Sequence, residues 1–162
     1  MKHICATLLL LCNTLNGDLD LDFIEKVKAC ALEHNATVES HERIPINLVL
    51  AQAIHESDWG RSRFATEGNN LFGIKALEGD DFIRSRNGKK LRSYHTWCES
   101  VGDYMDLLAN GKPYEEFQEQ LVRQYTVDNV NIYKLIEHLD EYAEDNEYEE
   151  KIKKLVKQLE NL

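Results

Sequence analysis

Apolar residues recur at helical spacing along most of the chain. The clearest run occupies positions i, i+3, i+4, i+7 and i+8 between residues 46 and 54: Ile46, Val49, Leu50, Ala53 and Ile54. A helix with this pattern carries one apolar stripe that faces the core. Pro45 suits its first position, because the N–H that proline lacks would have no partner inside the helix. We expect this helix to form the core of the domain.

The same period predicts the remaining helices. One helix begins near Phe23 and fades between residues 34 and 37. Another begins at the capping box Thr96-x-x-Glu99 and ends at Gly111 and Pro113. Further helices are expected at residues 117–121, 130–139 and 152–159.

Two segments break the helical period. Between residues 68 and 73, glycines and asparagines that tolerate positive φ accompany Leu71 and Phe72, which predicts a tight loop pinned into the core. Between residues 82 and 94, Asn87-Gly88 separates two short extended stretches, which predicts a β-hairpin with a two-residue turn. The predicted fold class is therefore mainly α (α+β), a helical domain with one small hairpin.

Length and composition favour one domain. The chain has 162 residues, 43% of them hydrophobic, and this size suits a single core. Residues 1–17 look like a signal peptide, because Lys2 and His3 precede an apolar run from Ile4 to Cys12; a helix packed on the domain is the alternative. That run is shorter than the roughly 20 residues of a membrane span. We expect residues 18–162 to form one exported domain, periplasmic, extracellular or at the cell wall, with no stable membrane insertion.

Charge and metal-binding residues limit the partners. The chain has 29 acidic and 19 basic residues and a net charge of -10, which repels nucleic acid and anionic bilayers. Cys30 and Cys98 would remain after signal removal, and a disulfide and two buried free thiols fit them equally well. Neither C-x-x-C nor H-E-x-x-H occurs, so we predict no metal and no other cofactor. His55 is expected to face solvent.

Glu56 is the candidate for chemistry. At about 100° per residue, it lies about 80° from the centre of the apolar stripe of its helix, at the boundary between core and solvent. Partial burial disfavours the charged form of a carboxyl and raises its pKa. A raised pKa is what a glycosidase needs in its general acid.

The residues around Glu56 strengthen this interpretation. The stretch from Leu50 to Ala65, followed by residues 68–74, matches the pattern A-Q-A-x-x-E-S-x-W-G-x-S and then N-N-L-F-G-I. It resembles glycoside hydrolase family 73, the β-N-acetylglucosaminidases of bacterial cell walls, and within it the Bax-like and flagellar muramidase-type members. The likeness covers roughly residues 44–152. It implies a lysozyme-like helical domain in which a small hairpin lobe flanks a groove for peptidoglycan glycan strands.

The resemblance also implies roles for individual residues. Glu56 takes the place of the catalytic acid, and the loop that contains Asn69, Asn70 and Phe72 lines the substrate groove. For Phe72, packing into the core is the stronger expectation. Trp59 suits stacking on a sugar ring and filling the core about equally.

A tyrosine is expected close to the acid. Residues 142–152 are similar to the family segment Y-A-x-D-x-x-Y-x-x-K-I, which contributes a tyrosine near the catalytic acid. We favour Tyr142 as the catalytic groove residue and Tyr148 as a packing residue at the substrate site. The spacing leaves the reverse assignment open.

The hairpin departs from the family pattern. Many members carry a glutamate there, whereas residues 82–94 contain no acid. Glu78, Asp80 and Asp81 are the nearest candidates for activating water, although a solvated acidic loop explains them as well. Assistance by the N-acetyl oxygen of the substrate is another route. The hairpin is instead basic; its cations either dock anionic groups of the wall or keep the strand edges from pairing.

Three functions remain in competition. The preferred one is hydrolysis, by a monomer, of the β-1,4 bond after N-acetylglucosamine in peptidoglycan. A lysozyme-like lytic transglycosylase would cleave after N-acetylmuramic acid and leave an anhydro ring. A non-catalytic domain that binds peptidoglycan or chitin would keep the groove without turnover.

Overall fold

The computed structural model describes residues 20–139 and 147–162, so the predicted signal peptide and Tyr142 lie outside the described residues. The helices are α1 (Leu21–Asn35), α2 (Ile46–Ser57), α3 (Arg63–Gly68), α4 (Trp97–Asn110), α5 (Glu115–Thr126), α6 (Ile132–Ile136) and α7 (Tyr148–Leu159). Two 3-10 turns, η1 (Ser40–Glu42) and η2 (Lys112–Tyr114), join them, and the strands are β1 (Phe82–Arg84) and β2 (Lys90–Arg92). The predicted fold class, mainly helical with one hairpin, is confirmed.

Short polar side chains begin several of these helices. The carboxylate of Asp20 accepts a hydrogen bond from the Phe23 N–H at 3.0 Å, and the Thr96 hydroxyl accepts one from the Glu99 N–H at 3.2 Å. Each of these bonds satisfies a backbone donor that has no partner inside the helix. Pro45 is a correction: with ψ of 129° it precedes α2 as its cap residue and is not its first helical residue.

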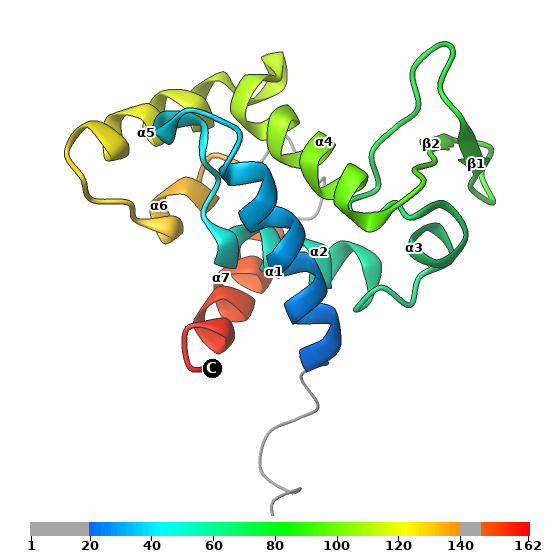
Figure 1. Ribbon diagram of the computed structural model, residues 1–162, viewed down its shortest axis with the longest axis horizontal. Helices are drawn as coiled ribbons and strands as arrows, with labels where there is room; N and C mark the ends of the chain where they lie inside the picture. Colours follow the sequence, from blue (N-terminus) through cyan, green and yellow to red (C-terminus); the bar gives the residue numbers. More distant parts are fainter. Residues whose placement is uncertain (1–19, 140–146) are drawn as a thin grey trace, which may run out of the picture.

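α2 lies at the centre of the helical body. Its side chains Leu48, Val49, Ala51 and Ala53 have no exposed surface. α1 and α7 both pack on α2, and α4 packs on α1 and α5. Figure 1 shows the hairpin and α3 on one side of this body and α5 and α6 on the other. None of the helices in residues 20–139 and 147–162 is long and apolar enough to cross a membrane.

A disulfide between Cys30 and Cys98 ties α1 to the first turn of α4, with a Cα–Cα distance of 4.8 Å. The two cysteines are 68 positions apart in the chain. Of the two alternatives left open by the sequence, the structure therefore has the disulfide.

The hairpin turn differs from the prediction. β1 and β2 pair antiparallel, with Ile83 opposite Leu91. The Ser85 N–H then donates to the Lys89 carbonyl at 2.8 Å, which leaves three residues in the loop, and among them only Gly88 has positive φ, of 84°. A two-residue turn of the type favoured by Asn-Gly needs positive φ at both positions. The loop is instead a three-residue turn that ends in a left-handed glycine.

Candidate active site

Glu56 lies in the last turn of α2, directly before a tight turn of the chain. The buried Ser57 hydroxyl donates to the Ala53 carbonyl at 2.6 Å and accepts from the Gly60 N–H at 2.8 Å. Three successive residues then have positive φ: Asp58, Trp59 and Gly60. A Cβ on Gly60 would lie 2.8 Å from the Trp97 ring and 2.9 Å from the Phe23 ring. Only glycine fits there, so packing fixes the path of the chain directly after Glu56.

Glu56 itself is half-buried and hydrogen-bonded to Tyr148, the first residue of α7. Burial raises the pKa of the Glu56 carboxyl from 4.5 to about 7, and the hydrogen bond from Tyr148 acts in the opposite direction. Burial raises the pKa because it removes water from the charged form, whereas a hydroxyl that donates to the carboxylate favours that form. The expected boundary position and raised pKa are both found.

Tyr148 is held from the other side by Gln52. The Gln52 Nε2 group donates to the Tyr148 hydroxyl at 2.7 Å, and the Tyr104 hydroxyl donates to the Gln52 Oε1 atom. Tyr104 comes from α4, so helices α2, α4 and α7 meet at this network. Burial and the nearby Glu56 charge both raise the pKa of Tyr148. Its phenol therefore stays protonated and keeps a proton to donate.

Aromatic contacts surround the network. The Phe72 ring stacks on Tyr104 with centroids 4.0 Å apart and planes 3° apart. The His55 ring meets Tyr148 edge-on, with centroids 5.3 Å apart. The expectation of a solvated His55 is wrong, because α7 covers this face of α2 and leaves the imidazole partly buried.

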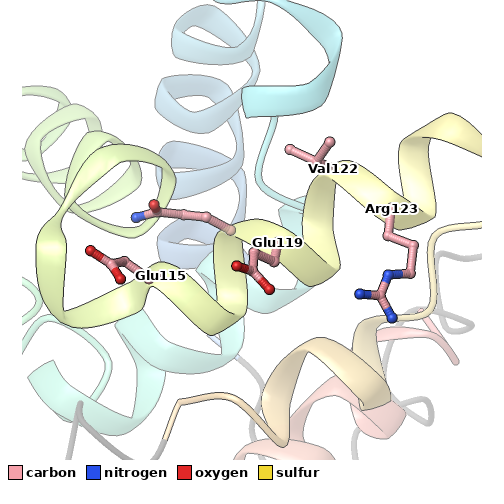
Figure 2. Close-up of a pocket in the computed structure, with 5 residues that line it drawn as sticks. Glu115, Glu119, Val122 and Arg123 are labelled. Carbon is pink, nitrogen blue, oxygen red and sulfur yellow. The ribbon is translucent and has the colours of Figure 1, made fainter.

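No group of three or more His, Cys, Asp or Glu side chains in residues 20–139 and 147–162 is placed to hold a metal ion. The hollow drawn in Figure 2 lies on α5 and is lined by Glu115, Gln118, Glu119, Val122 and Arg123. It shares no residue with the Glu56 network. The end of α2 presents a carboxyl with a pKa of about 7 next to the Tyr148 phenol.

The sequence profile of the family described as mannosyl-glycoprotein endo-beta-N-acetylglucosaminidase matches residues 33–161. The chain belongs to this glucosaminidase family. The resemblance inferred from the residues around Glu56 is thereby confirmed.

Individual relatives agree with this membership. Exo-glucosaminidase LytG of Bacillus subtilis is 30% identical over 129 residues, which cover 73% of this chain and 45% of LytG. Protein bax of Escherichia coli is 32% identical over 85 residues, which cover 52% of this chain and 31% of bax. The chain thus spans less than half the length of these curated relatives.

Solved structures show the same fold. The catalytic domain of the autolysin Auto from Listeria monocytogenes superposes with a TM-score of 0.68 at 23% identity, covering 91% of this chain and 89% of that domain. The glycoside hydrolase domain of FlgJ from Salmonella typhimurium gives a TM-score of 0.64 at 23% identity, covering 87% of this chain and 88% of that domain. At 23% identity, these likenesses show that the chain shares the fold of the two domains, and they show nothing further.

In this glucosaminidase domain, the side chains of the predicted groove loop mainly hydrogen-bond the loop to neighbouring backbone. The Asn69 side chain donates to the carbonyls of Tyr94 and His95 at 2.9 and 3.1 Å. The Asn70 side chain, 2% exposed, donates to the Ile74 carbonyl at 2.9 Å and to a carbonyl of β2 at 2.8 Å. These bonds tie the loop to the hairpin lobe.

The two predicted aromatic contacts of the groove differ in exposure. Phe72 is 2% exposed, in line with the packing role that was the stronger expectation. Trp59 is half-buried, meets Phe23 edge-on at a centroid distance of 6.0 Å and keeps part of its surface open. Of the two, Trp59 has the surface that a sugar ring could contact.

The candidate second carboxylates have other surroundings. Asp80 accepts from the Leu77 N–H at 2.8 Å and lies 3.5 Å from the Arg92 Nε atom, whereas Glu78 and Asp81 are exposed. Burial and the hydrogen bond from Tyr148 shift the pKa of Glu56. Glu78, Asp80 and Asp81 do not contribute to that shift.

Within the described residues, Tyr148 is the tyrosine that is hydrogen-bonded to Glu56. The sequence favoured Tyr142 for a place near the acid, and the spacing of the two tyrosines left Tyr148 open as the alternative. Tyr148 is 4% exposed, which fits the packing role that was favoured for it, and a groove role for Tyr142 stays a prediction. Gln52 and Tyr104 were missed as partners. The sequence did contain a signal for Gln52: it is a glutamine one turn before Glu56, at a position surrounded by apolar residues.

Proposed function

We propose that this chain is an enzyme that hydrolyses the β-1,4 bond after N-acetylglucosamine in peptidoglycan, with Glu56 as the general acid. The observation that carries the proposal is a half-buried carboxyl with a pKa of about 7 at the end of α2, hydrogen-bonded to Tyr148. Membership of the glucosaminidase family supports the substrate class.

The reaction follows from that geometry. Protonated Glu56 gives its proton to the bridging oxygen, and the bond from that oxygen to the anomeric carbon breaks. The positive charge that develops on the sugar ring is relieved when water adds to the anomeric carbon and loses a proton. In one route the lobe moves and Glu78, Asp80 or Asp81 takes that proton. In the other route the N-acetyl oxygen of the substrate bonds to the anomeric carbon as the bridging bond breaks; water then adds to that carbon, displaces the N-acetyl oxygen and gives its proton to the Glu56 carboxylate.

The surrounding residues support these steps in the proposal. Tyr148 stabilises the Glu56 carboxylate once the proton has left, and Trp59 offers a flat surface to a sugar ring. Asn69 and Asn70 brace the groove loop, with Phe72 packed beneath it. A catalytic role for Tyr142 stays a prediction.

The proposal includes export to the periplasm or cell wall and action as a monomer. The Cys30–Cys98 disulfide supports export, because disulfides persist in oxidising compartments. Relatives named as a glucosaminidase and a peptidoglycan hydrolase support the same setting.

The test is digestion of purified peptidoglycan by the wild type and by Glu56→Gln, with mass spectrometry of the fragments. We expect reducing N-acetylglucosamine ends from the wild type and a loss of about 10²- to 10⁴-fold in Glu56→Gln. The control is Glu25→Gln, an exposed glutamate of α1, which should keep full activity.

The same digest separates the alternatives. Anhydromuramic ends would identify a transglycosylase and contradict the proposal. Absence of fragments together with unchanged wall binding in Glu56→Gln would leave a binding domain. Among the expected products, long oligosaccharides indicate internal cleavage and small end-derived fragments indicate an exo-acting enzyme.

A further inference from the structure

Gln52 is a polar residue inside the core of the molecule. Its side chain is fully buried, and the residues on either side of it in α2 are Ala51 and Ala53. Burying an amide costs free energy unless both of its ends are hydrogen-bonded. Here both ends have partners, and each partner is a tyrosine from another helix.

The hydrogen bonds of this network run in one direction. The Tyr104 hydroxyl donates to the Gln52 Oε1 atom, so the Gln52 Nε2 group faces Tyr148. A hydroxyl has one proton and two lone pairs. Because the Tyr148 oxygen accepts from the amide, its own proton is left to point at Glu56, with which it is hydrogen-bonded.

The far end of the network is anchored by packing. The Tyr104 ring is fully buried and stacked on Phe72 at a centroid distance of 4.0 Å. A ring held in this way cannot swing its hydroxyl away from the glutamine. The aligned hydrogen bonds therefore run from Tyr104, which packs against Phe72 of the groove loop, through Gln52 and Tyr148 to the Glu56 carboxyl.

We infer that Gln52 is a positioning residue for the proposed reaction: its amide, aligned by Tyr104, holds the Tyr148 hydroxyl so that its proton points at the Glu56 carboxyl. The inference rests on the proposed function and deepens it. As Glu56 gives up its proton, negative charge develops on the carboxylate, and a donor already aimed at that charge stabilises it without reorganisation. Without Gln52, the amide that donates to the Tyr148 oxygen is lost, and the Tyr148 donor is less well preorganised toward Glu56.

The test is the pH profile of peptidoglycan hydrolysis for Gln52→Met, which keeps the length of the side chain and removes the amide. We expect kcat to fall about 10- to 100-fold with KM unchanged, because the Tyr148 hydrogen bond to the developing Glu56 carboxylate, a bond to a charged group, is weakened. The basic limb of the profile should move to higher pH by about one unit, because Glu56 loses a donor that favours its carboxylate.

A double-variant cycle shows whether Gln52 acts through Tyr148. Tyr148→Phe should move the basic limb in the same direction, and Gln52→Met in that background should move it no further. An additional shift of similar size in the Tyr148→Phe background would overturn the inference, as would an unmoved limb in Gln52→Met. The matched control is Gln124→Met, a buried glutamine of α5 whose replacement should leave the profile unmoved.

Two further measurements keep the test decisive. If Gln52→Met does not fold, Tyr104→Phe keeps the ring stack, removes the hydroxyl that aligns the amide, and should shift the limb in the same direction. The carboxyl ¹³C resonance of Glu56 in the free protein reports the titration of Glu56 alone. It separates that titration from those of the other titratable groups near the network in residues 20–139 and 147–162, namely His55, Tyr104, Tyr114 and Tyr148.

The carbon titration also separates the two proposals. If the wild type cleaves no peptidoglycan, the proposed function fails, and the titration still shows whether Gln52→Met raises the Glu56 pKa. An unchanged titration in a folded Gln52→Met protein refutes the positioning role alone.

Discussion

Replacing Glu56 with glutamine should stabilise the folded protein at high pH and leave its stability at low pH nearly unchanged. The folded carboxyl has a pKa of about 7, raised from 4.5, chiefly by burial. The folded state therefore holds this proton more tightly than the unfolded state does. The stability gained from protonation is complete below about pH 4.5 and is lost as pH rises through about 7.

The magnitude follows from the size of the shift. A rise from 4.5 to about 7, at about 1.4 kcal/mol for each unit, corresponds to about 3 kcal/mol at about pH 8. Glutamine has nearly the same shape, can accept the Tyr148 hydrogen bond and carries no charge. Glu56→Gln should therefore exceed the wild type by about 3 kcal/mol at about pH 8 and match it at about pH 4.

Urea unfolding at both pH values, followed by tryptophan fluorescence, measures the difference. Glu25→Gln controls for the loss of one negative charge from an acidic surface. An equal difference between Glu56→Gln and the wild type at both pH values would show that the Glu56 pKa is not raised in the folded state. The expected result would mean that the candidate acid is kept at the expense of stability.

Three other predictions concern the residues that hold the site in place. Loss of the Cys30–Cys98 disulfide, by reduction or by Cys98→Ala, should lower the free energy of unfolding by about 2–4 kcal/mol; equal urea midpoints with and without reductant would contradict this. Gly60→Ala should cost more than Gly88→Ala in thermal unfolding: both have positive φ, but only the Gly60 Cβ meets other atoms, which adds about 1–3 kcal/mol. Asn70→Ala should cost about 2–4 kcal/mol, because it leaves buried backbone groups of the loop and hairpin without partners, and amide hydrogen exchange in β2 should rise with it.

Much of the fold was predictable because helical periodicity is local. The spacing of Ile46, Val49 and Leu50 predicts a buried stripe, and the same geometry places Glu56 at its edge, where the structure has it. The cap at Thr96 is equally local, since its hydroxyl bonds an N–H three residues away. The motif around Glu56 also identified the family, because its residues lie close together in sequence.

The turn of the hairpin shows where local signals become ambiguous. Asn87-Gly88 is compatible with a two-residue loop, in which both residues take positive φ, and with a three-residue loop, in which Gly88 alone does. Pairing of the flanking strands decides between them. The result is a left-handed conformation at Gly88 but not at Asn87.

By itself, the sequence determined most of the helices, though not the short α3, together with the position of Glu56 at the boundary of α2 and the family. Only the tertiary structure decided that Tyr148 and Gln52 serve that carboxyl, that Tyr104 aligns the glutamine, and that Cys30 bonds to Cys98. These partners are separated by 52 to 96 positions in the chain. No periodic pattern spans such distances, because the packing of whole helices determines which side chains meet.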